Sequence, residues 1–136
     1  MGFEKFGTVS FTSESKASGF VDHLEKGQVM ATRCRKCGSV SFPPKMDCPS
    51  CLSSEVDWFE IKGPATLVTY AEVTYGPTGF ENDAPYTLAL ADYGQFKVFG
   101  RMRKDIAAKD LAVGMKVTVA PVKLAGDRVS YEFAKA

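Results

Sequence analysis

Four cysteines in two CxxC pairs are the residues of this chain whose type and spacing most clearly predict chemistry. The pairs are Cys34-Arg35-Lys36-Cys37 and Cys48-Pro49-Ser50-Cys51, and the sequence holds no other cysteine. Each CxxC turn presents two sulfur ligands, and Zn²⁺ prefers four such ligands in a tetrahedron. We therefore expect a structural zinc site with no coordination position left for a catalytic water, formed by Cys34, Cys37, Cys48 and Cys51.

The residues near the cysteine pairs agree with a metal site. Gly38 directly follows the first pair, at a point where the turn is expected to need a positive φ angle. Four thiolates around one Zn²⁺ carry a formal charge of about −2. Arg33, Arg35, Lys36 and Lys45 lie close enough in sequence to offset that charge.

Three other interpretations of the cysteines stay open. Four cysteines allow two disulfides, but the first residues of the sequence contain no long apolar segment of the kind found in a secretory leader. We therefore expect a reducing cytoplasm, in which disulfides are rare. A thioredoxin-like redox site uses one CxxC pair rather than two adjacent pairs. Iron is the third alternative, because both turns also resemble rubredoxin knuckles, although the short loop between them favours zinc.

Composition limits the function of the chain. The 136 residues are 45% hydrophobic, which is enough for one domain with a core and a small additional unit. The net charge of +1 provides no basic field for non-specific nucleic-acid binding, and no apolar segment approaches the roughly 20 residues that cross a bilayer. The single histidine, His23, is accompanied by no nucleophile elbow, phosphate loop or dinucleotide fingerprint. We expect a protein without catalytic residues of its own.

An amphipathic helix is predicted over residues 13–26, ahead of the cysteines. Ala17, Phe20, Val21 and Leu24 recur at helical spacing, and Gly27 provides a stop. Such an apolar stripe serves either packing within the chain or binding of a partner, and the sequence does not distinguish the two.

The remainder of the chain predicts a mainly β protein. Strands over residues 28–33 and 39–42 would form a ribbon hairpin around the metal, and from residue 56 the pattern changes to short alternating segments separated by Gly, Pro, Asn and Asp. These candidate strands cover residues 56–61, 65–74, 86–92, 96–103, 116–121 and 129–133. With one or two helical turns over 105–111, they predict a five-stranded barrel of the OB type. The predicted organisation is a helical segment over 1–27, a zinc ribbon over 28–55 and an OB-fold domain over 56–136.

Two further features suggest binding. The connection over residues 75–85 is long for a hairpin and carries Phe80, which could pack on the barrel or on a ligand. Lys97, Arg101 and Arg103 alternate with apolar residues along one predicted strand. Such a basic face could hold phosphates or simply be solvated.

The combination of motifs resembles a known family. In order, the chain has Cys34-x-x-Cys37-Gly38, then Phe42-Pro43-Pro44, then Cys48-Pro49-x-Cys51, followed by the barrel pattern. Together with the helical segment, it resembles the rubredoxin-like zinc-ribbon plus OB-fold proteins associated with acyl-CoA metabolism, long described as a domain of unknown function. The resemblance covers nearly the whole chain from about residue 15.

The resemblance implies an accessory subunit that pairs with a thiolase-superfamily protein. In such complexes the partner holds the catalytic residues, and the small protein supports assembly or the acyl-CoA site. Within the family, the chain is similar to the small subunit of the two-component thiolases of anaerobic aromatic degradation, such as benzoylsuccinyl-CoA thiolase. The implied cofactors are one structural zinc and CoA or acyl-CoA bound at the partner interface.

A coenzyme A site needs cations for its phosphates and an aromatic wall for its adenine. The candidates on this sequence are Lys97, Arg101, Arg103, Tyr75, Phe80 and Tyr86. They could instead form a protein interface with Trp58 as an anchor. Two other functions stay open: a single-stranded nucleic-acid-binding module, since ribbons and OB barrels both serve that purpose, and a free-standing acyl-CoA binder.

Overall fold

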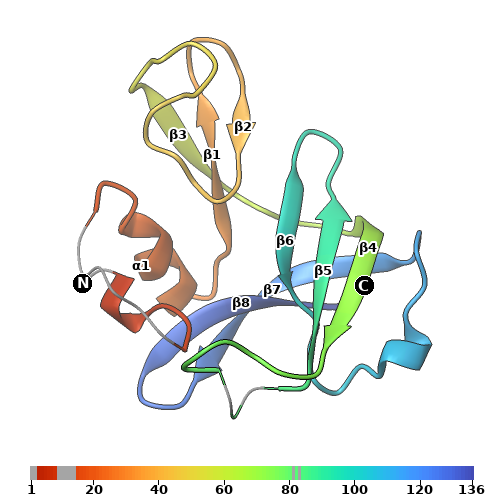
Figure 1. Ribbon diagram of the computed structural model, residues 1–136. Helices are drawn as coiled ribbons and strands as arrows, with labels where there is room; N and C mark the ends of the chain where they lie inside the picture. Colours follow the sequence, from red (N-terminus) through yellow and green to blue (C-terminus); the bar gives the residue numbers. More distant parts are fainter. Residues whose placement is uncertain (1–2, 9–14, 81, 83) are drawn as a thin grey trace.

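The computed structural model describes residues 3–8, 15–80, 82 and 84–136, and these residues form two antiparallel sheets flanked by a short α-helix (Figure 1). The elements in chain order are η1 (Phe3–Lys5), α1 (Gly19–Glu25), β1 (Met30–Cys34), β2 (Val40–Ser41), β3 (Val56–Glu60), β4 (Ala65–Val73), β5 (Tyr86–Asp92), β6 (Lys97–Arg101), η2 (Ala108–Asp110), β7 (Lys116–Leu124) and β8 (Arg128–Lys135). The mainly β architecture with an N-terminal helix, a ribbon and an OB-type sheet is therefore confirmed. No helix among the described residues is long and apolar enough to cross a membrane.

The ribbon is a three-stranded sheet in the order β2-β1-β3. The predicted hairpin is present, with Thr32 paired to Ser41. The third strand differs from the sequence analysis, which placed residues 56–61 at the start of the barrel: β3 pairs with β1 along its whole length, from Met30↔Glu60 to Cys34↔Val56. An alternating pattern predicts a strand but not its neighbour, and the chain returns to the ribbon before it reaches the barrel.

The barrel is a five-stranded sheet in the order β6-β5-β4-β7-β8. A register shift between Leu67 and Thr69 marks a β-bulge in β4, the strand that pairs with both β5 and β7. Bulges bend a strand and increase its twist, which helps a sheet to close. The closure is visible where Met102 bridges Phe133 and the Arg103 backbone N–H donates to the Phe133 carbonyl at 2.9 Å. The predicted helical turns over 105–111 are reduced to the three residues of η2.

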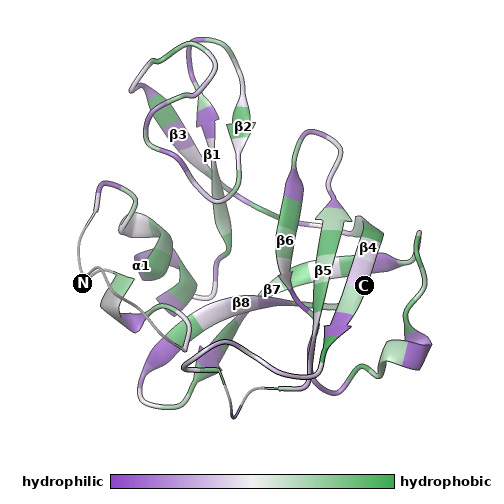
Figure 2. Ribbon diagram, viewed as in Figure 1, coloured by the Kyte–Doolittle hydropathy of each residue, from purple (hydrophilic) through white to green (hydrophobic). Residues whose placement is uncertain are grey.

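Burial alternates along the barrel strands, although Figure 2 shows β5 as hydrophobic along most of its length. In β5 the buried residues are Thr87, Ala89 and Ala91, while the residues between them are only partly buried. Inward-facing residues of β7 and β8 complete the core, with Val117 and Phe133 fully buried. The strand pattern thus leaves one face of β4, β5 and β6 turned away from the core.

Helix α1 uses its apolar stripe within the chain. Phe20, Val21 and Leu24 are all buried, and α1 packs against β8 and β1. The helix is shorter than the predicted 13–26, of which residues 13 and 14 lie outside the described residues. The structure therefore favours self-packing of this stripe over partner binding.

Aromatic rings join the helix, the ribbon and the barrel. The Phe20 ring lies 6.0 Å from Phe42 of the ribbon and 6.1 Å from Tyr131 of β8, centroid to centroid. On the other side of the ribbon, Phe59 of β3 meets Phe96 at 5.9 Å, and the Arg33 guanidinium donates to the Gln95 side chain at 3.2 Å. Contacts on both sides fix the ribbon relative to the barrel.

The N-terminal segment is attached to the barrel, which the sequence analysis did not foresee. Phe6 forms a parallel bridge with Val129, and the Gly7 backbone N–H donates to the Val129 carbonyl at 2.7 Å. The Arg128 side chain donates in turn to the Gly7 carbonyl at 2.6 Å. These contacts place Phe6 and Gly7 along the edge of β8.

Candidate functional site

The two cysteine turns have the same backbone hydrogen-bond pattern. In the first turn the Cys34 N–H donates to the Ser39 carbonyl and the Gly38 N–H donates to the Cys34 carbonyl, at 2.9 and 3.0 Å. In the second turn the N–H of Cys48 donates to Ser53 and that of Leu52 to Cys48, at 2.8 and 2.9 Å. Each turn therefore presents its two sulfurs in the same way, as expected of paired metal-binding knuckles.

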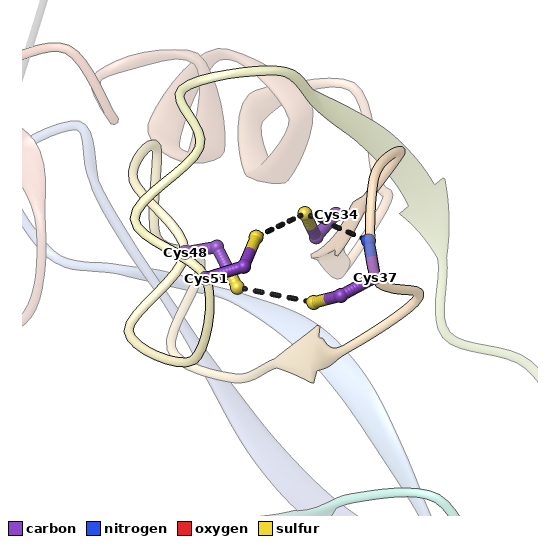
Figure 3. A group of neighbouring side chains, drawn as sticks. All are labelled: Cys34, Cys37, Cys48 and Cys51. Carbon is purple, nitrogen blue, oxygen red and sulfur yellow. Dashed lines mark hydrogen bonds between the residues drawn. The ribbon is translucent and has the colours of Figure 1, made fainter.

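The four sulfur atoms converge on one point, as Figure 3 shows. All four lie within 4.8 Å of one another, and the Cys34–Cys51 and Cys37–Cys48 pairs are each 3.5 Å apart. A tetrahedron with Zn–S bonds of about 2.3 Å has edges of about 3.8 Å. The sulfur arrangement therefore fits one tetrahedral Zn²⁺ and is too open for an S–S bond of about 2.0 Å.

The acidity of the thiols agrees with a cation site. A backbone N–H of Cys37 lowers the pKa of Cys34, and the Ser39 hydroxyl lowers the pKa of Cys37. For Cys51, the Ser53 backbone N–H lowers the pKa, but desolvation and the three neighbouring thiols outweigh it and raise the pKa to about 12. Since close thiolates repel one another, the full tetrathiolate needs a cation, which a bound Zn²⁺ would supply.

The equivalent turn positions carry different residues. Gly38 has a φ of 80° and Leu52 a φ of 63°, and the Leu52 side chain is 83% exposed. A left-handed backbone is natural for glycine and costs a leucine roughly 1–2 kcal/mol. The position of Gly38 after the first pair predicted a positive φ there, but nothing in the sequence indicates that Leu52 adopts the same backbone conformation.

A second candidate site is a groove between the barrel and the N-terminal segment. Its volume is about 300 Å³, and its lining includes Phe80, Tyr86 and Arg101 together with Phe6 and Leu88. The Arg101 guanidinium carbon lies 5.4 Å from the centroid of the Tyr86 ring, at cation–π distance. The groove thus combines one cation with aromatic walls, as a phosphate-bearing aromatic ligand requires.

Three of the six residues predicted for coenzyme A therefore lie together, and three lie elsewhere. Lys97 is at the opposite end of β6, in register with Asp92. Arg103 forms ion pairs with Asp105 at 3.2 Å and Glu132 at 4.0 Å. Tyr75 is 82% exposed and does not line the groove. Sequence reasoning also missed Phe6, Gly7 and Thr8, because only the tertiary fold brings the N-terminal segment to this groove.

His23 and Trp58 have structural surroundings. The His23 Nδ1 atom lies 3.1 Å from the Gln28 side-chain oxygen, and its ring is 5.6 Å from the ring of Trp58. The Trp58 ring faces the start of α1, where a Cβ atom at Gly19 would lie 3.4 Å away. Both side chains therefore help to hold α1 against the ribbon.

Known protein families match the ribbon and the barrel separately, with the boundary between the two matches inside β3. Residues 21–57 match the rubredoxin-like zinc ribbon domain of ChsH2, and residues 58–122 match its C-terminal OB-fold domain. A DUF35 domain-containing scaffold protein of Methanocaldococcus jannaschii is 30% identical over 94 residues, which are 68% of this chain and 67% of that protein. The chain belongs to the DUF35 family.

This DUF35 chain is also similar to an enzyme subunit and to a solved structure. The benzoylsuccinyl-CoA thiolase subunit BbsA of Thauera aromatica is 27% identical over 126 residues, covering 90% of this chain and 83% of BbsA. The solved structure of the Ltp2-ChsH2(DUF35) aldolase includes a chain with a TM-score of 0.74 and 19% identity, which matches 90% of this chain and 97% of its own length. The latter similarity shows a shared fold. The family match and the four grouped cysteines together support a structural zinc.

Proposed function

We propose that this chain is a non-catalytic accessory subunit of a thiolase-superfamily complex that acts on acyl-CoA. The observation that carries the proposal is its similarity to a thiolase subunit over 90% of its length. The narrower proposal is thiolytic cleavage of an aromatic 3-oxoacyl-CoA such as benzoylsuccinyl-CoA, with the catalytic groups in the partner. The reduced thiols of the zinc ribbon favour the cytoplasm as the site of action.

The groove at Arg101 is the proposed contact of this chain with coenzyme A. The guanidinium would bind a phosphate, and the rings of Phe80 and Tyr86 would contact the adenine or the pantetheine chain. A volume of about 300 Å³ is at the low end for ligand pockets, so that only part of coenzyme A fits. The partner enzyme would then supply the remaining wall, and the isolated chain would bind coenzyme A weakly.

Zinc has a structural role in this proposal. The four cysteines would hold it as a closed tetrathiolate, which shapes the ribbon and keeps Phe42 and Phe59 in contact with the rest of the chain. Lys97 and Tyr75, which are exposed and lie outside the groove, are then available for contacts with the partner.

Co-purification tests the proposal. The chain would be co-expressed with the thiolase-superfamily protein encoded nearest to its gene. Sedimentation would measure the assembly of the two proteins, and calorimetry would measure the affinity of the complex for CoA. We expect a defined hetero-oligomer whose CoA dissociation constant rises at least tenfold in Arg101→Gln, while Arg35→Gln, a change to an exposed arginine of the ribbon, leaves it unchanged. Two proteins that migrate separately at micromolar concentrations would refute the proposal.

The two competing functions give different results in the same experiments. A free-standing acyl-CoA binder would bind acetyl-CoA at micromolar concentration without any partner. A nucleic-acid-binding module would raise the fluorescence anisotropy of a labelled single-stranded oligonucleotide at physiological salt, and Arg101→Gln would weaken that binding.

A further inference from the structure

The aromatic ring of Phe6 belongs to the wall of the groove that contains Arg101. Two rings from other parts of the fold support it: Phe20 at 5.8 Å and Tyr131 at 6.2 Å, centroid to centroid. Phe20 is buried, Tyr131 is partly buried, and neither lines the groove. The position of the Phe6 ring in the groove therefore depends on two rings that lie outside it.

Phe42 of the ribbon contacts the same two rings. Its ring lies 6.0 Å from Phe20 and 5.3 Å from Tyr131, centroid to centroid and edge to face in both pairs. Phe42 itself does not line the groove. Aromatic pairs with this geometry attract one another beyond the effect of their buried area. Phe42 and Phe6 thus share both supporting rings, although they belong to different parts of the fold.

The ribbon anchors the backbone on both sides of Phe42. Ser41 pairs with Thr32 of β1, and the Lys45 backbone N–H donates to the Thr32 hydroxyl at 3.0 Å. The same hydroxyl donates to the Lys45 carbonyl at 2.9 Å. Thr32 is 1% exposed, so that water does not compete for these hydrogen bonds. Phe42 is therefore held in place by the segment that joins the two cysteine turns.

The Phe6 ring needs such support. The bridge between Phe6 and Val129 holds the backbone of the N-terminal segment. It does not fix the side chain, because one backbone conformation allows several staggered rotamers. Phe3, 5.9 Å away, belongs to the same segment and moves with it. Packing against Phe20 and Tyr131 therefore selects the rotamer of Phe6 that lines the groove.

We infer that Phe42 is a positioning residue for the coenzyme A groove: through Phe20 and Tyr131 it keeps the Phe6 ring against the ligand. The inference rests on the proposed function of the groove. It adds a residue of the ribbon that sets the affinity of the barrel for coenzyme A without touching the ligand.

The test measures the CoA dissociation constant of the co-expressed complex by calorimetry. We expect a rise of about tenfold in Phe6→Ala and, for the loss of roughly one aromatic pair, of about fivefold in Phe42→Ala. The matched control is Phe59→Ala, because Phe59 joins the ribbon to Phe96 on its other side. This control should leave the constant within about twofold. Zinc content and melting temperature verify that each variant is folded.

A double variant tests the route through Phe6. If Phe42 acts on the ligand through Phe6, the combined Phe6→Ala and Phe42→Ala changes should weaken CoA binding by about tenfold, as Phe6→Ala does alone. Independent effects would multiply to about fiftyfold, and that result would overturn the inference.

A third measurement needs neither ligand nor enzyme. The Gly7 N–H, adjacent in the chain to Phe6, donates to the Val129 carbonyl at 2.7 Å. In NMR spectra of the isolated chain, we expect the Gly7 amide signal to shift in Phe42→Ala and to stay in place in Phe59→Ala. An unshifted signal in Phe42→Ala would overturn the inference.

The outcomes separate this inference from the proposed function. If the unaltered complex does not bind CoA, or binds it equally well in Arg101→Gln, the proposed site fails and the inference fails with it. If Arg101→Gln weakens binding and Phe42→Ala does not, only the positioning role is wrong. An equal loss in Phe42→Ala and Phe59→Ala would show a general loosening of the ribbon and would also overturn it.

Discussion

Removing the Phe20 ring should uncouple helix α1 from the rest of the molecule. Phe20 is only 3% exposed, and four aromatic rings surround it at centroid distances from 5.8 to 6.4 Å: Phe3, Phe6, Phe42 and Tyr131. These rings belong to three parts of the fold, namely the N-terminal segment, the ribbon and β8. They cannot all collapse into the space that an alanine would leave.

The expected magnitude follows from this packing. Truncation of a buried phenylalanine costs about 3–5 kcal/mol, and a cavity that cannot collapse places Phe20→Ala near 4 kcal/mol. A domain of this size is stable by roughly 5–15 kcal/mol, so the loss is a large fraction of the total. At about 3 °C per kcal/mol the melting temperature should fall by roughly 10–15 °C.

Urea unfolding at a fixed zinc concentration measures this prediction. The matched control is Asp22→Ala, an exposed residue of the same helix, which should change the free energy of unfolding by less than about 0.5 kcal/mol. Hydrogen exchange should show that the amides of α1 lose protection in Phe20→Ala. A change below about 1 kcal/mol in Phe20→Ala would show that α1 is not held by this cluster and would reopen its use for a partner.

Three other properties are open to direct measurement. Elemental analysis should find one zinc per chain, and Cys48→Ala should lose it; iron in the unaltered chain would instead correct the identity of the metal. Gly100→Ala should lower the free energy of unfolding in urea by roughly 1–3 kcal/mol, because the new Cβ would lie 3.0 Å from the Tyr131 ring. Gly19→Ala, whose Cβ would lie 3.4 Å from Trp58, should be neutral or stabilising. Equal effects of the two substitutions on the free energy of unfolding would contradict the packing. Burial raises the pKa of Tyr131 to about 12 from an ordinary value of 10.0. The folded state therefore holds this proton more tightly than the unfolded state does. The resulting stabilisation is complete below pH 10 and is lost as the pH rises to about 12. The free energy of unfolding should fall by about 3 kcal/mol over this range, and this decline should be absent in Tyr131→Phe.

The sequence predicted the elements with strong local signals. The bounds of β5 agree with the predicted residues 86–92, because a short apolar segment lies between Pro85 and Gly94, which limit it on both sides. The metal cluster was predictable for a similar reason, since the CxxC spacing encodes a local turn. Both features depend on short-range pattern alone.

Features that depend on long-range contacts were not predictable. The pattern of β3 shows a strand, but its pairing with β1 follows from the path of the chain. The apolar residues of α1 were predictable, but the surface that they contact, which is the rest of the same chain, was not. Lys97 and Arg101 lie four residues apart on β6, or about 13 Å, too far for one small site. Arg103 lies beyond the end of β6, where the chain turns to close the barrel.

The activity of the reconstituted complex tests the central claim most directly. Thiolysis of an acyl-CoA would be measured with the thiolase-superfamily partner alone, this chain alone, and the two combined in their assembled ratio. An accessory subunit without catalytic groups predicts no activity for the chain alone and an increase of at least tenfold when it joins the partner. Full activity of the partner without this chain, or thiolysis by the chain alone, would contradict the account.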